Sequence, residues 1–214
     1  MKNRFLVGIC LLFASTLSQA DVILLDFEGV GDQASILDFY NGGTDSLGNS
    51  GVDYGVSFGS NTLGLKESNP LANFSGEPTA ETAMFFLTGS AILNFAQGFD
   101  TGFSFYYSTT TFDGVVNVFD EINGAGNILG TINIAALGIG PDSANPFSNW
   151  NIGALGFSGI AKSIDFGGTV NQVGYDNITF GSINPNQVSV PEPISLALLG
   201  LGLVGIGFSR KRKL

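Results

Sequence analysis

Short β-prone runs separated by glycine and asparagine turns fill residues 21–190, and they restrict this region to a β architecture. The runs cover residues 22–27, 54–58, 83–87, 91–95, 115–119, 128–134, 163–166 and 172–180. In a further run, alternation places Phe103, Phe105 and Tyr107 on one face. The region has no segment with the 3.6-residue apolar period of an amphipathic helix. The pattern predicts an all-β fold, an antiparallel β-sandwich of the jelly-roll type, with most of the 19 phenylalanines in its core.

The residue types that the chain lacks narrow its chemistry. It has no histidine and a single cysteine, Cys10, which excludes a Ser-His-Asp or Cys-His nucleophile, a zinc site of imidazole or thiolate ligands and an intramolecular disulfide. Residues 21–190 have no arginine and only Lys66 and Lys162 against 17 carboxylates, a net charge of −15. Such a region does not suit nucleic acid, which needs a basic surface, but it favours cations.

The first 20 residues have the pattern of a secretory signal peptide. Lys2 and Arg4 precede an apolar stretch over residues 5–17, and small residues lie where a signal peptidase reads the chain. We expect cleavage between Ala20 and Asp21, by signal peptidase after the export machinery has engaged the chain. An uncleaved membrane anchor is the alternative, which the short apolar stretch disfavours.

The C-terminal end has three parts in a fixed order. Pro191, Glu192 and Pro193 are followed by an uninterrupted apolar run over residues 194–208 and by a basic tail over residues 210–214. As a helix the run would span about 22 Å at about 1.5 Å per residue. This is less than the roughly 30 Å hydrocarbon core of a bilayer, so we expect a short transmembrane helix that needs snorkelling basic side chains or local thinning. Positive charge at both ends favours keeping both ends cytoplasmic while the region between them crosses the membrane.

This tail resembles, over residues 188–214, the PEP-CTERM sorting signal of Gram-negative bacteria. In that family the three parts are recognised by exosortase, an integral-membrane transpeptidase-like protease, and accompany surface display and exopolysaccharide-producing biofilm or floc lifestyles. The resemblance implies that Pro191, Glu192 and Pro193 are the recognition site for exosortase. It divides the chain into a signal peptide (1–20), a β-sandwich domain (21–187) and a sorting signal (188–214). A single-span anchor that is never cut is the alternative.

Acidic residues at the two ends of the domain form a candidate calcium site. Asp26 and Glu28 point the same way from one strand, and Asp176 would lie near them if the first and last strands pair. Carboxylates with backbone carbonyls make the hard oxygen site that Ca²⁺ prefers. The arrangement resembles jelly-roll carbohydrate-binding modules, in which an early acidic residue and an Asp of the last strand hold a structural calcium ion. The alternative is that these carboxylates are solvated or accept hydrogen bonds in turns.

Flat aromatic side chains are the candidate ligand contacts of the domain. Tyr54, Tyr106 and Trp150 offer rings that can stack on the C–H faces of sugars, with a place in the core or at its rim as the alternative for each. Trp150 lies in the second of two long loops that we expect, over residues 42–55 and 138–152.

Together these features predict an exported protein of the cell surface or extracellular matrix, anchored in the inner membrane as a precursor and sorted by exosortase. Its sandwich would be structural or adhesive, linked to exopolysaccharide and to biofilm or floc formation, and would have no enzymatic activity and no cofactor except calcium. A carbohydrate-binding module is the first alternative. The second is a polysaccharide hydrolase with paired carboxylates, which is disfavoured because no acidic motif marks a cleft.

Overall fold

The computed structural model of this protein describes residues 22–79 and 81–186. The expected signal peptide with its cleavage site between Ala20 and Asp21, and the whole sorting signal with its apolar run, lie outside these residues. Within the described ranges no helix is long and apolar enough to cross a membrane.

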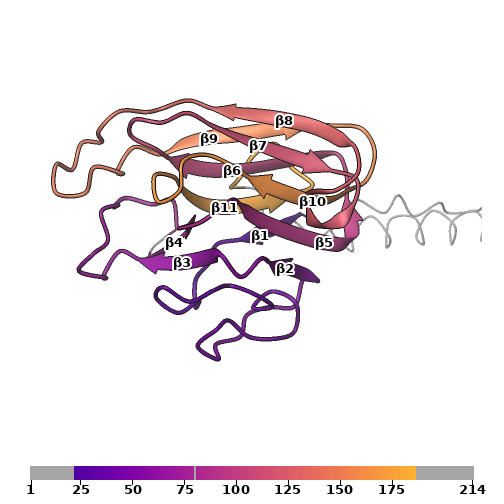
Figure 1. Cartoon of the computed structure of the whole chain (residues 1–214), viewed down its shortest axis with the longest axis horizontal. Coiled ribbons are helices and arrows are strands. Elements are labelled where there is room, and N and C mark those ends of the chain that lie inside the picture. Colours follow the sequence, from indigo (N-terminus) through magenta and orange to yellow (C-terminus); the bar gives the residue numbers. More distant parts are fainter. Residues whose placement is uncertain (1–21, 80, 187–214) are drawn as a thin grey trace, which may run out of the picture.

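Two antiparallel sheets form the domain (Figure 1). Sheet A has the order β3 (Thr62–Lys66), β4 (Thr82–Phe86), β11 (Gly174–Phe180), β6 (Gly102–Ser108) and β9 (Asn151–Gly156), and β1 (Ile23–Leu25) also pairs with β11. Sheet B has the order β2 (Val56–Phe58), β5 (Ala91–Phe99), β10 (Ala161–Phe166), β7 (Gly114–Phe119) and β8 (Ile128–Ile134). A 3-10 turn, η1 (Ile122–Gly124), lies between β7 and β8. The predicted antiparallel β-sandwich is confirmed.

Most strands lie where the sequence predicts them, and β8 has the predicted bounds. The sequence analysis does not predict strands β3 and β9, because their glycines interrupt the apolar alternation. The expected second long loop accordingly ends at residue 150, where β9 begins. The first strand is shorter than predicted, since the chain turns at Phe27, whose φ is 61°.

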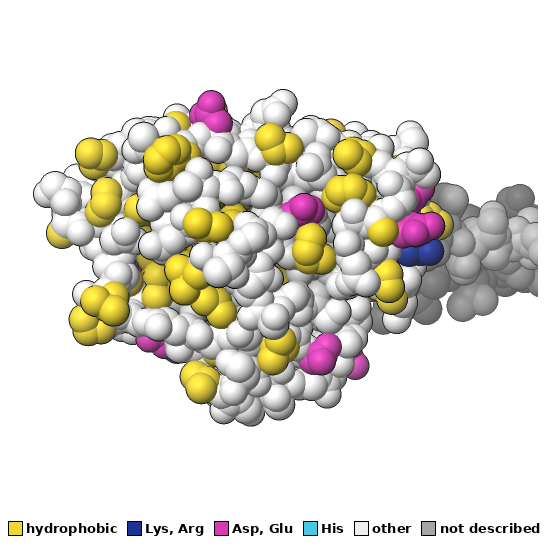
Figure 2. Space-filling view, in the orientation of Figure 1, with side chains coloured by type: hydrophobic (Ala, Val, Ile, Leu, Met, Phe, Trp, Pro, Cys, Tyr) yellow, Lys and Arg dark blue, Asp and Glu magenta, His cyan; other side chains and the backbone are white. Residues whose placement is uncertain are grey.

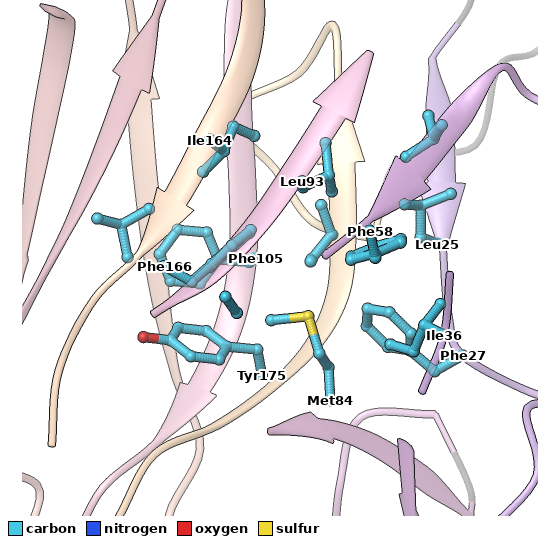
Figure 3. Packing of buried hydrophobic residues seen from close by; sticks show 14 of the residues in the cluster. Leu25, Phe27, Ile36, Phe58, Met84, Leu93, Phe105, Ile164, Phe166 and Tyr175 are labelled. Atoms are coloured by element: carbon cyan, nitrogen blue, oxygen red, sulfur yellow. The ribbon is translucent and has the colours of Figure 1, made fainter. Parts of the chain in front are cut away.

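Aromatic rings fill the space between the sheets (Figure 3). Phe103, Phe105 and Tyr107 of β6 are all buried on the core side, as their alternation predicts. The Phe105 ring meets the ring of Tyr175 edge to face, with centroids 5.6 Å apart. The Tyr175 hydroxyl donates to the carbonyl of Gly167 at 2.7 Å, so the most buried tyrosine has its polar end satisfied.

The chain between β1 and β2 wraps one side of the sandwich, below β2 and β3 in Figure 1. Asp45 is buried in this segment, and its carboxylate accepts hydrogen bonds from the backbone N–H groups of Gly31, Leu47 and Asn49 at 2.8 to 2.9 Å. Burial alone would raise the pKa of Asp45, but hydrogen bonds from Asn49, Gly31 and Leu47 outweigh it and lower the pKa. The carboxylate therefore organises a loop that has no regular secondary structure.

Candidate functional site

Pairing of the first and last strands brings the predicted acidic residues to one seam of sheet A. In the antiparallel pair, Leu25 of β1 lies opposite Ile178 of β11. Further along the same edge of β11, Tyr175 pairs with Met84 of β4. Along β11, pairing with β1 therefore ends and pairing with β4 begins near Asn177, where β11 has a bulge and φ is 51°. We call this junction, with the carboxylates around it, the acidic seam.

Near the end of β1, two carboxylates of the seam accept hydrogen bonds from the backbone. Asp26 accepts from the N–H of Glu28 at 3.1 Å. Glu28 accepts from the N–H groups of Glu81 and Thr82, at 2.7 and 2.9 Å, and so ties the start of β4 to the chain that follows β1. Both carboxylates thus accept hydrogen bonds from backbone N–H groups. Asp26 does so within a turn, which was the alternative to calcium binding, and Glu28 does so across the sheet.

Asp176 is fully buried and holds the chain ahead of β4 on the last strand. Its two oxygens accept from the N–H of Thr79 at 2.9 Å and from the N–H of Asn177 at 2.7 Å. Burial raises the pKa of Asp176 to about 8 against the lowering effect of these two bonds, and the charges of Glu77 and Asp26 raise it further. The seam therefore favours a neutral carboxyl at this position.

Glu77 is a member of the seam that the sequence analysis does not single out. Both of its carboxylate oxygens are buried, and within residues 22–79 and 81–186 neither forms a hydrogen bond with another residue. Burial raises the pKa of Glu77 against the lowering effect of its own backbone N–H, and the charges of Glu67, Glu28 and Glu81 raise it further. Ionising a buried carboxyl group that lacks such bonds costs free energy, which agrees with its raised pKa.

The predicted calcium ligands Asp26, Glu28 and Asp176 come close enough for their charges to interact with neighbouring carboxylates, but they do not converge on one point. In the part of the chain that the structure describes, no group of three or more acidic side chains is placed to hold a metal ion. Calcium binding at the seam therefore stays a prediction.

A groove lies on the outer face of sheet A, at the end where β6 finishes at Ser108 and β11 starts at Gly174. Two loops meet above this end, since the N–H of Phe147 donates to the carbonyl of Asn73 at 3.1 Å. The groove is shallow, with a cavity volume of about 40 Å³, and it is open to solvent. The groove is thus formed on sheet A by the loops that contain Asn73 and Phe147 and by Asn171 and Val173, which precede β11.

Aromatic rings form the apolar wall of this groove. Trp150 meets Phe74 edge to face at a centroid distance of 6.5 Å, and Phe147 packs in the same cluster. The indole N–H of Trp150 donates to the carbonyl of Ser75 at 3.1 Å, which fixes the orientation of the ring. The wall is therefore positioned before any ligand arrives.

The polar groups that line the groove are uncharged. They include the amides of Asn73 and Asn171, and none of the lining residues is acidic or basic. The side chain of Ser108 is 1% exposed, and its hydroxyl has no hydrogen-bond partner within the described ranges. The hydroxyls of Thr62 and Thr82 share this property, but of the three only Ser108 lines the groove, where its hydroxyl keeps unused hydrogen-bonding capacity.

Of the three candidate aromatic residues, Trp150 lines the groove and the other two lie elsewhere. Tyr54 is half-buried and stacks on Tyr40, with ring centroids 6.2 Å apart. Tyr106 is on the outer face of β6, and its hydroxyl accepts from the side-chain amide of Asn186 at 2.6 Å. The hydroxyl of Tyr106 is therefore already hydrogen-bonded to Asn186, near the end of the described residues.

Residues 189–213 match the family model of the PEP-CTERM protein-sorting motif. The matched segment contains Pro191, Glu192 and Pro193, the apolar run and most of the basic tail. The resemblance inferred from the sequence is confirmed, and it defines an exported protein that carries its sorting signal at the C-terminus. The protein is a β-sandwich with a PEP-CTERM motif, the signal by which exosortase sorts exported chains.

Solved structures share part of the sandwich. A family 6 carbohydrate-binding module, studied by binding sub-site dissection, is 18% identical with a TM-score of 0.36, over 58% of this chain and 85% of that one. CsCBM6-3 from Clostridium stercorarium, in complex with cellobiose, is 17% identical with a TM-score of 0.37 over the same shares. A glycoside hydrolase family 43 arabinoxylan arabinofuranohydrolase from Bacillus subtilis, in complex with cellotetraose, is 19% identical with a TM-score of 0.38, over 56% and 24%. No curated protein matches the chain in sequence. TM-scores this low carry no argument about a ligand or a reaction.

Proposed function

We propose that this protein is displayed at the cell surface or in the extracellular matrix after sorting by exosortase, and that its sandwich adheres to a neutral polysaccharide through the groove beside Trp150. The observation that carries the binding function is the buried, unpartnered hydroxyl of Ser108 in an aromatic groove. The sorting motif supplies the location at which an extracellular polysaccharide is met.

The groove has the chemistry that a sugar unit requires. The partly exposed ring of Trp150 offers flat apolar surface to the C–H face of a pyranose, and the buried ring of Phe74 supports it from the side. The amides of Asn73 and Asn171 both donate and accept, which suits vicinal hydroxyl groups. A sugar hydroxyl is also the partner that Ser108 lacks.

The charge of the protein favours a neutral polymer over an anionic one. Residues 21–190 carry a net charge of −15 and no arginine, so an anionic polysaccharide is repelled as it approaches and meets no bidentate cation. Neutral sugars bind without this penalty, through stacking and uncharged hydrogen bonds.

Sorting is tested by replacing Pro191, Glu192 and Pro193 together with alanine and fractionating cells that contain exosortase. We expect the unaltered chain at the surface or in the medium in a shortened form, and the variant retained in the inner membrane at greater mass. Equal fractionation of the two proteins contradicts exosortase sorting.

We further propose that the acidic seam binds Ca²⁺. Support comes from Glu77, whose buried oxygens form no hydrogen bond with another described residue, and from the neighbouring carboxylates Asp26, Glu28 and Asp176. A hard divalent cation would compensate this charge after side-chain movements that bring the ligands together.

A hydrolytic function has less support, because a glycosidase needs two carboxylates that flank the scissile bond. None of the residues lining the groove is acidic. The carboxyl with the strongly raised pKa, Asp176, is fully buried and accepts two backbone hydrogen bonds.

A further inference from the structure

The two sides of the sandwich protect their strand edges unequally (Figure 1). On one side, the chain between β1 and β2 covers both edge strands. The N–H of Gln33 donates to the carbonyl of Gly64 in β3 at 2.8 Å, and the N–H of Val56 in β2 donates to the carbonyl of Tyr40 at 3.1 Å. These edges are therefore closed to an incoming strand.

On the other side, β8 ends sheet B and β9 ends sheet A. Within residues 22–79 and 81–186, no further strand or loop forms backbone hydrogen bonds with the outer edge of either strand. The two strands lie against each other, and Leu155 of β9 packs so closely on Gly130 of β8 that no Cβ would fit there. They form one open surface, the β8–β9 edge, made of residues 128–134 and 151–156.

The β8–β9 edge lacks the residues that normally block edge-to-edge pairing. Open edges in natural sheets usually carry lysine, other charges or proline. Between residues 122 and 161 the chain has one charged side chain, Asp142, which lies in the loop between the two strands. Ile128 and Ile152 are 56% and 46% exposed, so apolar side chains flank the open backbone. A long, uncharged, β-prone edge is a template for another strand.

We propose that the β8–β9 edge pairs with the same edge of a second copy of this chain. The distribution of charge favours a second copy over another partner. The remaining acidic side chains lie outside residues 122–161, several of them on the face shown in Figure 2, and Asp120 and Asp113 accept from the N–H groups of Asn127 and Ala136 beyond the two ends of β8. Two copies therefore meet least repulsion along the uncharged length of the two strands. A basic partner would instead gain most by docking on the acidic surfaces.

The geometry of pairing is that of a twofold contact. Two β8 strands related by a twofold axis run antiparallel, so each offers its outward N–H and C=O groups to identical groups of the other. Sheet B then continues from one copy into the next. Trp150 precedes β9 directly, but no residue of the β8–β9 edge lines the groove, so sedimentation and polysaccharide titration test the two proposals separately.

Sedimentation of the full chain in detergent tests the pairing. We expect a concentration-dependent doubling of mass that strengthens with salt, because screening weakens the repulsion between acidic bodies. Replacing Ile128→Glu and Ile152→Glu together places like charges at the contact and should raise the dimer dissociation constant about tenfold or more. Leu71→Glu makes the same change at a side chain 81% exposed in the loop between β3 and β4, and it should leave the constant unaltered.

A cross-linking arm keeps the test decisive if the double variant folds poorly. In a Cys10→Ser background, Thr131→Cys in the middle of β8 should form an intermolecular disulfide under mild oxidation, because disulfides need Cα atoms within about 7 Å. Leu71→Cys should not. A monomer at all concentrations and salts, or equal cross-linking at both positions, overturns the proposal.

Discussion

The backbone N–H of Thr79 donates to the carboxylate of Asp176 at 2.9 Å, across 97 positions of the sequence. This bond fastens the loop ahead of β4 to the last strand, and the Thr79 hydroxyl adds a second bond to the side chain of Asn177 at 2.7 Å. The carboxylate that makes the bond is fully buried and lies near the charge of Glu77. We therefore expect the acidic seam to make the stability of the domain depend on pH.

Stability should fall as the pH rises through the neutral range. The pKa of Asp176 is about 8 in the folded chain, against an ordinary value of 3.8, so the folded state holds a proton that the unfolded chain releases. The stabilising effect is fully present below about pH 4 and is lost by about pH 8, and Glu77, whose pKa is also raised, contributes in the same direction. Urea unfolding at several pH values in EDTA measures this slope.

Asp176→Asn should flatten that slope, because the amide keeps an acceptor for Thr79 without an ionisable proton. Asp100→Asn, an exposed change at the end of β5, is the control and should leave the slope as it is. An unaltered slope in Asp176→Asn would show that another group carries the pH dependence.

Calcium should raise the melting temperature of the unaltered protein, and more so at pH 7 than at pH 5, because the ligands must be ionised. Glu77→Gln should remove the response, because the amide is an uncharged and weaker ligand for a hard cation. Glu121→Gln, an exposed change outside the seam, should retain the response. Calorimetric titration without heat, together with an unchanged melting temperature, would exclude the calcium site.

Two buried serines on the same face of β6 make a matched pair. The Ser104 hydroxyl donates to the carbonyl of Ser182 at 2.9 Å, whereas the Ser108 hydroxyl has no hydrogen-bond partner among the residues that the structure describes. Ser104→Ala should therefore cost about 1 kcal/mol of unfolding free energy, and Ser108→Ala about zero. Chemical denaturation of both variants makes the comparison. A cost at Ser108 equal to that at Ser104 would contradict the idea that this hydroxyl is reserved for a ligand.

The β-sandwich was predictable because its strands alternate and its turns are marked by glycine and asparagine. The burial of Phe103, Phe105 and Tyr107 follows directly from that alternation. The strands β3 and β9 were not predictable in the same way, since Gly64 and Gly153 hide the period that reveals a strand.

Less of the candidate sites could be predicted. The closeness of Asp26 and Asp176 could be predicted, because it follows from pairing between the first and last strands, a common feature of such folds. Glu77 and Ser108 carry no local signal, because their significance comes from burial without a partner, which depends on loops that meet only in the folded chain. Trp150 could be singled out as the sole tryptophan, but its groove could not.

Titration of tryptophan fluorescence tests the central claim most directly, because Trp150 is the only tryptophan and lines the groove. The full chain is titrated with neutral glucans, mannans and xylans and with anionic alginate. We expect a saturable change with at least one neutral polymer and none with alginate, and an affinity about tenfold weaker in Ser108→Ala and Asn171→Ala. Absence of any change with every neutral polymer, or equal affinity in Ser108→Ala, would contradict polysaccharide binding in this groove.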